Sequence, residues 1–262
     1  MFISLIIPVF VGWLAGLLVN YLADVLPITR TFSRPVCHVC KKEFTILDYF
    51  LFRPCSDGHY RSIRTWVTQL VSLGIGVYIW MNAPEKIGYV PSLLLTTYFM
   101  LVFVIDLEHR LILHPTSLAG AVIGLGTGVL LHGIKDTLLG GAGGLGIMLS
   151  LYFMGVWFTK FRAKRMQAAG QEPDDEEALG AGDVILVTIL GLILGWPLIW
   201  FGLLFGILLG GAVSLILVGW LIVSRQYGKN ALMLFIPYGP YFIISAFLII
   251  FLPHWVALLV PN

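Results

Sequence analysis

Long apolar stretches separated by short polar interruptions dominate the sequence. Runs of about 20 apolar residues form helices that cross the roughly 30 Å hydrocarbon core of a bilayer. The expected spans cover residues 2–24, 66–81, 91–107, 115–132, 137–158, 183–199, 200–223 and 231–252. Only the polar segment at residues 25–65 is large enough to fold outside the lipid. The pattern predicts an all-α, polytopic integral membrane protein with about eight transmembrane helices.

The composition agrees with this pattern. Hydrophobic residues make up 58% of the chain and charged residues 11%, whereas a soluble domain has about 25% charged residues. This balance excludes a soluble enzyme. The small net charge of +2 says little by itself. The lipid bilayer is the expected environment, and no nucleic-acid partner is expected.

The basic residues predict the orientation of the chain. Of the 16 lysines and arginines, all except Lys86 and Lys135 lie in four interruptions, at residues 25–65, 107–114, 159–182 and 224–230. By the positive-inside rule, these segments are cytoplasmic. Eight spans then put both termini outside. The first span lacks a preceding basic residue and a following small-residue cleavage site, so we expect a permanent helix rather than a removed signal peptide.

Many glycines recur at four-residue spacing within the expected spans. This spacing lets helix backbones approach closely in lipid, and it indicates helix packing rather than chemistry. The clearest sets are Gly140/Gly144, Gly191/Gly195 and Gly202/Gly206/Gly210.

All three cysteines fall in the cytoplasmic segment. Cys37 and Cys40 have the spacing of a metal-binding pair, and a reducing compartment argues against disulfides. Together with Cys55 and His59 they could form a tetrahedral zinc site with three thiolates and one imidazole. His38 is an alternative fourth ligand, and three inert or redox-active thiols are the alternative to a metal site. The zinc would be structural, because the segment is too small to build much core.

Two aspartates adjoin apolar runs where ionisation is costly. Asp106 ends a span expected to run inward, and Asp183 opens a span expected to run outward. Both are therefore predicted at one depth, just inside the cytoplasmic face. Acidic residues at such positions are usually functional. Asp24 also ends a span, where it could simply reach interfacial water.

Two carboxylates at one depth can share a proton and hydrolyse a peptide bond without a metal. Gly180 and Gly182, which precede Asp183, would allow an irregular backbone and close approach of a substrate strand. From the residues alone, the pair could equally serve a proton-coupled transporter, although transporter sites usually lie nearer the membrane midplane. A third alternative is that the aspartates only stabilise helix packing.

Other residues could shape this site. Arg110 follows Asp106 by four residues, so on a continuing helix it would lie on the same face; the alternative is an anchor at the lipid headgroups. Pro237 and Pro240 are expected to break or kink the last span and so shape the cavity.

Four motifs in the sequence resemble those of the type IV prepilin peptidases, which are membrane aspartyl proteases of the GxGD class. Asp106-Leu-Glu-His-Arg and Gly180-Ala-Gly-Asp-Val are similar to the two catalytic motifs of that family, and Ile236-Pro-Tyr-Gly-Pro-Tyr241, which contains Gly239, resembles its last span. Gly16-Leu-Leu-Val-Asn20, Leu26-Pro27 and the Cys37/Cys40 pair are similar to its N-terminal region.

The resemblance implies an endopeptidase in the inner (plasma) membrane of a prokaryote. Asp106 and Asp183 would be its catalytic pair, and it would remove the basic leader of type IV prepilins or type II secretion pseudopilins at the cytoplasmic face. The implied parts are a first helix (1–24), the Cys-containing segment (25–65) and a seven-helix peptidase domain (66–262).

Many members of this family then methylate the new N-terminus with S-adenosylmethionine. Here the sequence departs from their pattern, because Val25, Gly58 and Gln69 stand where an arginine, a cysteine and a glutamate are usual. Methylation is therefore the less secure part of the implied activity.

Overall fold

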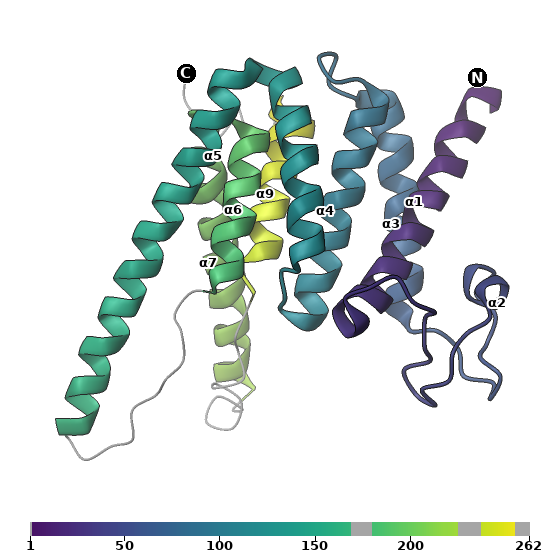
Figure 1. The fold of residues 1–262 in the computed structure, drawn as a ribbon, viewed down its shortest axis with the longest axis horizontal. Helices are drawn as coiled ribbons and strands as arrows, with labels where there is room; N and C mark the ends of the chain where they lie inside the picture. Colours follow the sequence, from purple (N-terminus) through teal and green to yellow (C-terminus); the bar gives the residue numbers. More distant parts are fainter. Residues whose placement is uncertain (1, 169–179, 225–236, 255–262) are drawn as a thin grey trace. The chain divides into compact units, whose positions relative to one another are not determined.

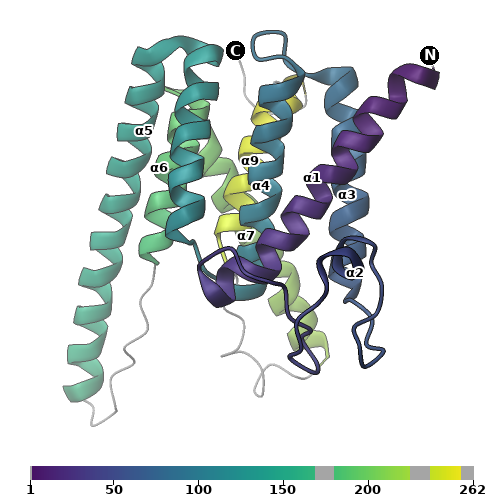
Figure 2. The ribbon, with the colours of Figure 1, turned by 45° about the vertical axis from the view of Figure 1, so that its right-hand side comes forward.

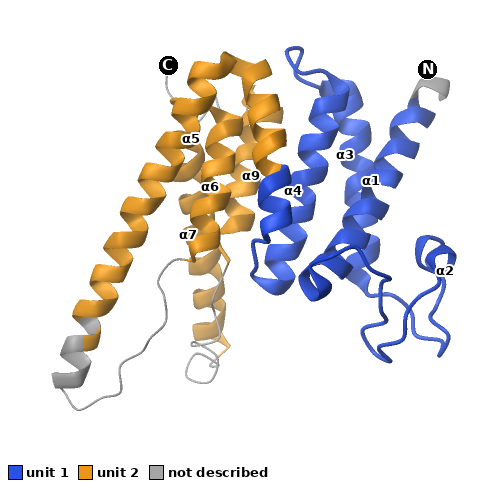
Figure 3. Cartoon of the chain, viewed as in Figure 1, with its two compact units in different colours: residues 1–119 blue, residues 120–262 orange. Residues whose placement is uncertain are grey.

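The computed structural model describes residues 2–168, 180–224 and 237–254, which fold mainly into α-helices (Figure 1). The chain divides into two compact units, residues 1–119 and 120–262 (Figure 3). The helices of the described ranges are α1 (Phe2–Thr29), α2 (Ile46–Phe50), α3 (Ile63–Asn82), α4 (Tyr89–His109), α5 (His114–Ala168), α6 (Ala181–Leu194), α7 (Leu198–Val223) and α9 (Gly239–Phe251).

The all-α membrane architecture is confirmed, whereas the number of spans stays a prediction. Among the described residues, four helical stretches are long and apolar enough to cross a bilayer. They are Leu5–Thr29, Tyr89–His109, His114–Phe161 and Leu198–Val223. Helices α6 and α9 are apolar but shorter, and residues 231–236 of the last expected span lie outside the described residues. Eight membrane crossings are therefore not established.

In the first unit, α1, α3 and α4 lie side by side (Figures 1 and 2). Helix α1 continues to Thr29, five residues beyond the expected end of the first span. Its last turns continue because Ala23 and Leu26 are buried in one hydrophobic cluster with Ile105 of α4 and Leu113. This packing brings the end of α1 against the end of α4.

In the second unit, the glycine pattern acts in helix packing, as expected. Gly140 of α5 and Gly191 of α6 face each other so closely that a methyl group on either would overlap the carbonyl oxygen of the other. A Cβ at Gly206 of α7 would likewise overlap the ring of Phe242 in α9. On the same pair of helices, the Ser245 hydroxyl donates a hydrogen bond of 2.7 Å to the carbonyl of Gly202.

Two helix boundaries are set by glycine and proline. Helix α5 changes direction at Gly133, which has a non-helical backbone (φ 83°), so the two spans expected over 115–132 and 137–158 are two limbs joined at one residue. The expected boundary between spans at 199 and 200 is wrong, since α6 ends at Leu194 and α7 begins at Leu198. Gly195 adopts φ 71°, and Pro197, which lacks an N–H, cannot continue α6.

The contact between α5 and α6 predicts a stability difference between two glycines of α5. Gly140→Ala should destabilise the protein by about 1–3 kcal/mol, since the added methyl group forces two packed backbones apart. Gly146→Ala is the matched control, because a Cβ at Gly146 meets nothing within 4 Å. Thermal unfolding in detergent measures both. Equal unfolding temperatures for the two variants would contradict the packing described here.

Candidate functional site

Asp106 lies in the last turn of α4 and is only 5% exposed. The residues before it, Val104 and Ile105, are buried in the cluster that joins α4 to α1. Helix α4 ends at His109, where the N–H of Arg110 donates a hydrogen bond of 2.9 Å to the Asp106 carbonyl. The carboxylate is thus fixed on a packed helix end, immediately before the chain leaves the helix.

Helix α4 does not continue through Arg110, which was the condition for its side chain to share a face with Asp106. Arg110 has a left-handed backbone (φ 54°, ψ 41°) just after the end of the helix, and it is exposed. The helical spacing that would have brought its side chain onto the face of Asp106 is therefore absent. Its exposure fits the alternative, in which Arg110 anchors the helix end at the headgroups.

Asp183 lies in the first turn of α6. The N–H of Gly180 donates a hydrogen bond to its carboxylate, and the Asp183 N–H in turn donates to the Gly180 carbonyl at 3.1 Å. The backbone of Gly180 (φ −76°, ψ 143°) is open to any residue. What glycine provides at this position is space, because a Cβ would stand 3.7 Å from the Asp183 carboxylate. Gly182 lies next to Asp183 in the same turn.

The other expected site residues lie at the start of α9. Pro237 precedes the helix, and Gly239 is its first residue and is buried. Pro240 occupies the first turn, where its missing N–H leaves no helix hydrogen bond unmade. The expected interruption of the last span is thus the beginning of a helix. Asp106 belongs to the first unit and Asp183 to the second, so their pairing stays a prediction.

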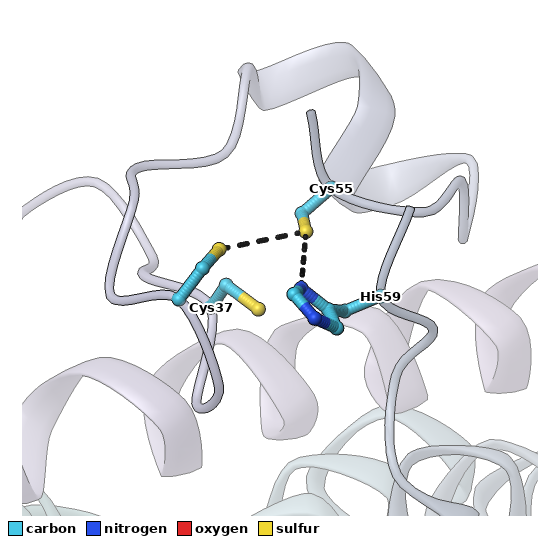
Figure 4. Close-up of side chains that lie close together, drawn as sticks. Cys37, Cys55 and His59 are labelled. Carbon is cyan, nitrogen blue, oxygen red and sulfur yellow. Dashed lines mark hydrogen bonds between the residues drawn. The ribbon is translucent and has the colours of Figure 1, made fainter. Parts of the chain in front are cut away.

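A cluster of possible metal ligands lies in the chain segment that connects α1 to α3. Cys37, Cys40, Cys55 and His59 converge from two loops, and their ligand atoms all lie within 4.8 Å of one another (Figure 4). The Cys40 and Cys55 sulfurs are 3.6 Å apart, and the Cys55 sulfur is 3.4 Å from Nδ1 of His59. These four residues could bind a metal ion.

Two tight turns present the cysteines. The N–H of Lys41 donates to the carbonyl of Cys37 at 2.9 Å, and the N–H of Gly58 donates to that of Cys55 at 2.8 Å. Lys41 and Gly58 close their turns with positive φ, 60° and 80° respectively. In each turn, backbone N–H groups donate to the sulfur of the cysteine that begins the turn. The N–H groups of Cys40 and Val39, for example, donate to the sulfur of Cys37. The two turns are similar, although the second contributes only one cysteine.

The turns favour the thiolate forms of Cys37 and Cys55, the forms that bind metals. Burial alone raises the pKa of Cys37, but the backbone N–H groups of Cys40 and Val39 outweigh this effect and lower it. The same balance, with donors from Asp57 and His59, lowers the pKa of Cys55. The N–H of Lys42 lowers the pKa of Cys40, but burial and the neighbouring side chains, Cys37 and Cys55 among them, raise it to about 11. A bound cation would offset the neighbouring thiolates and so favour ionisation of Cys40 as well.

His59, rather than His38, belongs to the cluster. The His38 ring instead lies 3.8 Å from the carboxylate of Asp24. The nearby Asp24 carboxylate raises the pKa of His38, against the opposing effect of burial. The alternative fourth ligand thus has a different partner.

The position of Asp24 in the sequence suggested that its side chain could reach interfacial water, but it does not. It is buried, and its carboxylate pairs with two arginines, Arg61 at 3.1 Å and Arg64 at closer range. The Tyr49 hydroxyl also donates a hydrogen bond to it. The guanidinium of Arg61 lies 3.9 Å from the centre of the Tyr49 ring. Asp24 therefore ties the loop segment to the ends of α1 and α3.

Arg64 extends this network to α4. Its Nη1 donates to the Asn20 side chain at 3.2 Å, and its Nε pairs at 3.0 Å with Glu108, two residues after Asp106. Asn20 and Gln69 continue the network between α1 and α3. These contacts were not predicted, although a buried acid requires a partner. Arg61, just before α3, and Arg64, in its first turn, were the available signal.

Residues 93–215, a little under half of the chain, match the model of the Type IV leader peptidase family. This part of the chain is similar to that family, which supports the resemblance noted in the sequence. The matched region contains Asp106 and Asp183, whereas the Cys/His cluster and the start of α9 lie outside it. No curated protein and no solved structure matches the chain.

The buried Asp24 network predicts a large loss of stability in one variant. Asp24→Asn removes the carboxylate that pairs with Arg61 and leaves Arg64 only its pair with Glu108, so we expect a loss of about 3–5 kcal/mol. Asp48→Asn is the matched control, because its pair with Arg53 is exposed on the protein surface and contributes less than about 1 kcal/mol. Chemical unfolding in detergent, followed by circular dichroism, compares them. A loss no greater for Asp24→Asn than for Asp48→Asn would disprove the structural role of Asp24.

Proposed function

We propose that this protein removes the basic leader from type IV prepilins or type II secretion pseudopilins at the cytoplasmic face of a prokaryotic inner membrane. The family match supports a leader peptidase. The observation that carries the proposal is the placement of two carboxylates within the matched region. Asp106 is buried at the end of one apolar helix, and Asp183 lies in the first turn of another.

Asp106 and Asp183 would divide the work of an aspartyl peptidase. The ionised carboxylate takes a proton from a water molecule, whose oxygen attacks the scissile carbonyl. The protonated carboxylate donates its proton to the carbonyl oxygen, which becomes a hydroxyl group of the tetrahedral intermediate. Collapse of this intermediate breaks the C–N bond, and a proton passes to the departing amine. The products are the leader with a new carboxylate and the pilin with a new N-terminus.

The glycines beside Asp183 would receive the substrate backbone. The open space beside the carboxylate at Gly180 suits close approach of an extended peptide. Gly182 and the turn at Pro237 and Gly239 would shape the same cavity. Arg110, exposed at the end of α4, would hold that end at the headgroups.

The cluster of Cys37, Cys40, Cys55 and His59 would hold a structural zinc ion. Tetrahedral zinc, with Zn–S of about 2.3 Å and Zn–N of about 2.0 Å, places two sulfurs about 3.8 Å apart and sulfur and nitrogen about 3.5 Å apart. The Cys40–Cys55 and Cys55–His59 separations of 3.6 and 3.4 Å are close to these values. Four protein ligands leave no open position for a substrate, so the metal would stabilise the segment rather than take part in hydrolysis.

The N-methylation that the family resemblance implies is not needed for this proposal. Gln69, which stands where a glutamate is usual, donates its amide to the carbonyl of Trp13 at 2.8 Å. An ionised carboxylate has no proton to donate to that carbonyl, so the residue serves helix packing in this chain. The assay below includes S-adenosylmethionine and detects a methyl group if one is added.

Substitution of either aspartate should abolish cleavage. With purified protein and a prepilin, Asp106→Asn and Asp183→Asn should each reduce the rate at least about 100-fold, since each removes a proton-transfer group. Mass spectrometry of the products identifies the cleaved bond and any added methyl group. Asp136→Asn, the same change in the second limb of α5, should cleave normally. Cleavage that survives in either active-site variant would sink the catalytic assignment, and failure of the unmodified protein to cleave would favour a transporter.

Zinc content should depend on His59 and not on His38. We expect one zinc ion per chain in the unmodified protein and in His38→Ala, and a large loss in His59→Ala and Cys55→Ser. Elemental analysis of the purified proteins measures this directly. Zinc should be released as the pH falls, because protons compete for the thiolates and the imidazole. Equal zinc content in His38→Ala and His59→Ala would rule out this ligand set.

A further inference from the structure

The segment between α1 and α3 exposes a set of large apolar side chains. Leu47 in α2 and Leu51 just after it are 70% and 55% exposed, and Ile46 is exposed beside them. Leu47 and Leu51 are four residues apart, so they lie on the same side of one helical turn. Tyr49 points the other way and is buried against Asp24. The turn thus has one face fixed to the protein and one apolar face that no described residue covers.

This turn lies beside the transmembrane helices rather than beyond their ends. The ring of Phe52 stacks on Trp66 of α3 with centroids 4.8 Å apart and on Trp13 of α1 at 6.2 Å. Trp13 precedes Asp24 by about three turns, or about 16 Å along the helix axis. It belongs to the stretch of α1 that is apolar and long enough to cross a bilayer. Figures 1 and 2 show α2 alongside α1 and α3, while neighbouring loops of the segment extend past the helix ends.

Specific contacts hold the turn in this position. Phe52 adopts φ 57°, a conformation that bulky residues rarely take and that needs compensating contacts. Those contacts are its two stacked tryptophans and the guanidinium of Arg61, 5.1 Å from its ring. The N–H of Leu51 closes the turn by donating to the Leu47 carbonyl at 2.9 Å. The apolar face is therefore presented by a constrained structure.

The surface that continues from this face is the lipid-facing surface of α1 and α3. Phe10, one turn before Trp13 on α1, and Leu70, one turn after Trp66 on α3, are exposed apolar residues on the faces that contact Phe52. At the depth of Trp13, the medium around a spanning helix is hydrocarbon. The charged residues of the turn also fit a position at the headgroups, because Asp48 and Arg53 pair with each other at 3.5 Å and a long arginine side chain can reach the interface.

We propose that residues 46–53, the α2 loop, lie in the membrane leaflet on the side of the Cys/His cluster. Leu47 and Leu51 insert among the acyl chains, Phe52 bridges the loop to α1 and α3, and Arg53 stays at the headgroups. The bilayer covers the apolar face of Leu47 and Leu51, because this face is continuous with the apolar surface of α1 and α3. This second attachment holds the Cys/His cluster against the membrane surface, and it does not depend on the peptidase activity.

Depth-dependent quenching tests the position of the α2 loop. A fluorescent noncanonical amino acid replaces Leu51 in the full-length protein, so that the cysteines stay intact, and the protein is reconstituted into vesicles. Arg34 is the matched control position, because it is exposed in the same segment and lies outside the loop. Lipids with brominated acyl chains should quench the probe at position 51 severalfold more than the probe at position 34. Aqueous iodide should show the opposite order.

Two results would overturn the proposal. Equal access of iodide to both positions would place the α2 loop in water. Protection of position 51 from iodide without quenching by brominated lipid would show that a second copy of the protein covers it. A probe at Leu47 serves as an independent second position, and unchanged metal content and unfolding temperature confirm that each labelled protein is folded.

Discussion

The buried carboxylate of Asp24 is the contact on which the first unit depends. One side chain near the end of α1 accepts contacts from Arg61, just before α3, from Arg64 in the first turn of α3 and from Tyr49 of the loop segment. Three of the chain's few charges are largely taken out of water to make these pairs, which is tolerable only because each has a counter-charge. Without Asp24, the arginines and Tyr49 would have no common partner.

This constraint connects the two chemical features of the first unit. Arg64 contacts Asp24 and Asn20 on α1, and it also pairs with Glu108, next to the end of α4 that carries Asp106. Tyr49 packs in a small cluster with Cys37 and Cys55. The segment that could hold a metal ion and the helix end that carries a buried aspartate are therefore joined by one polar network.

Much of this arrangement could be predicted from the sequence, because lipid imposes simple patterns. Long apolar runs predicted the helices, glycine spacing predicted the contact between α5 and α6, and cysteine spacing predicted the Cys/His cluster. These features depend on residues close together in the chain or on one repeated spacing, so the sequence carries them directly.

Contacts between distant residues could not be predicted in this way. The pairing of Asp24 with Arg61 and Arg64 joins two helices across a polar segment, and the extension of α1 to Thr29 follows from packing on α4. The α2 loop packs onto Trp13 and Trp66 through aromatic contacts. The spacing of residues along the sequence does not predict these contacts. The match to the leader peptidase family identifies residues 93–215 but does not include these contacts.

We propose that Asp106 and Asp183 form one catalytic site around a single water molecule. An experimental structure of the Asp106→Asn variant with an uncleaved prepilin would test this pairing. The side chains at positions 106 and 183 should flank the scissile peptide bond, both within hydrogen-bonding reach of its carbonyl or of one water beside it. Side chains too far apart to share a water molecule would rule the pairing out.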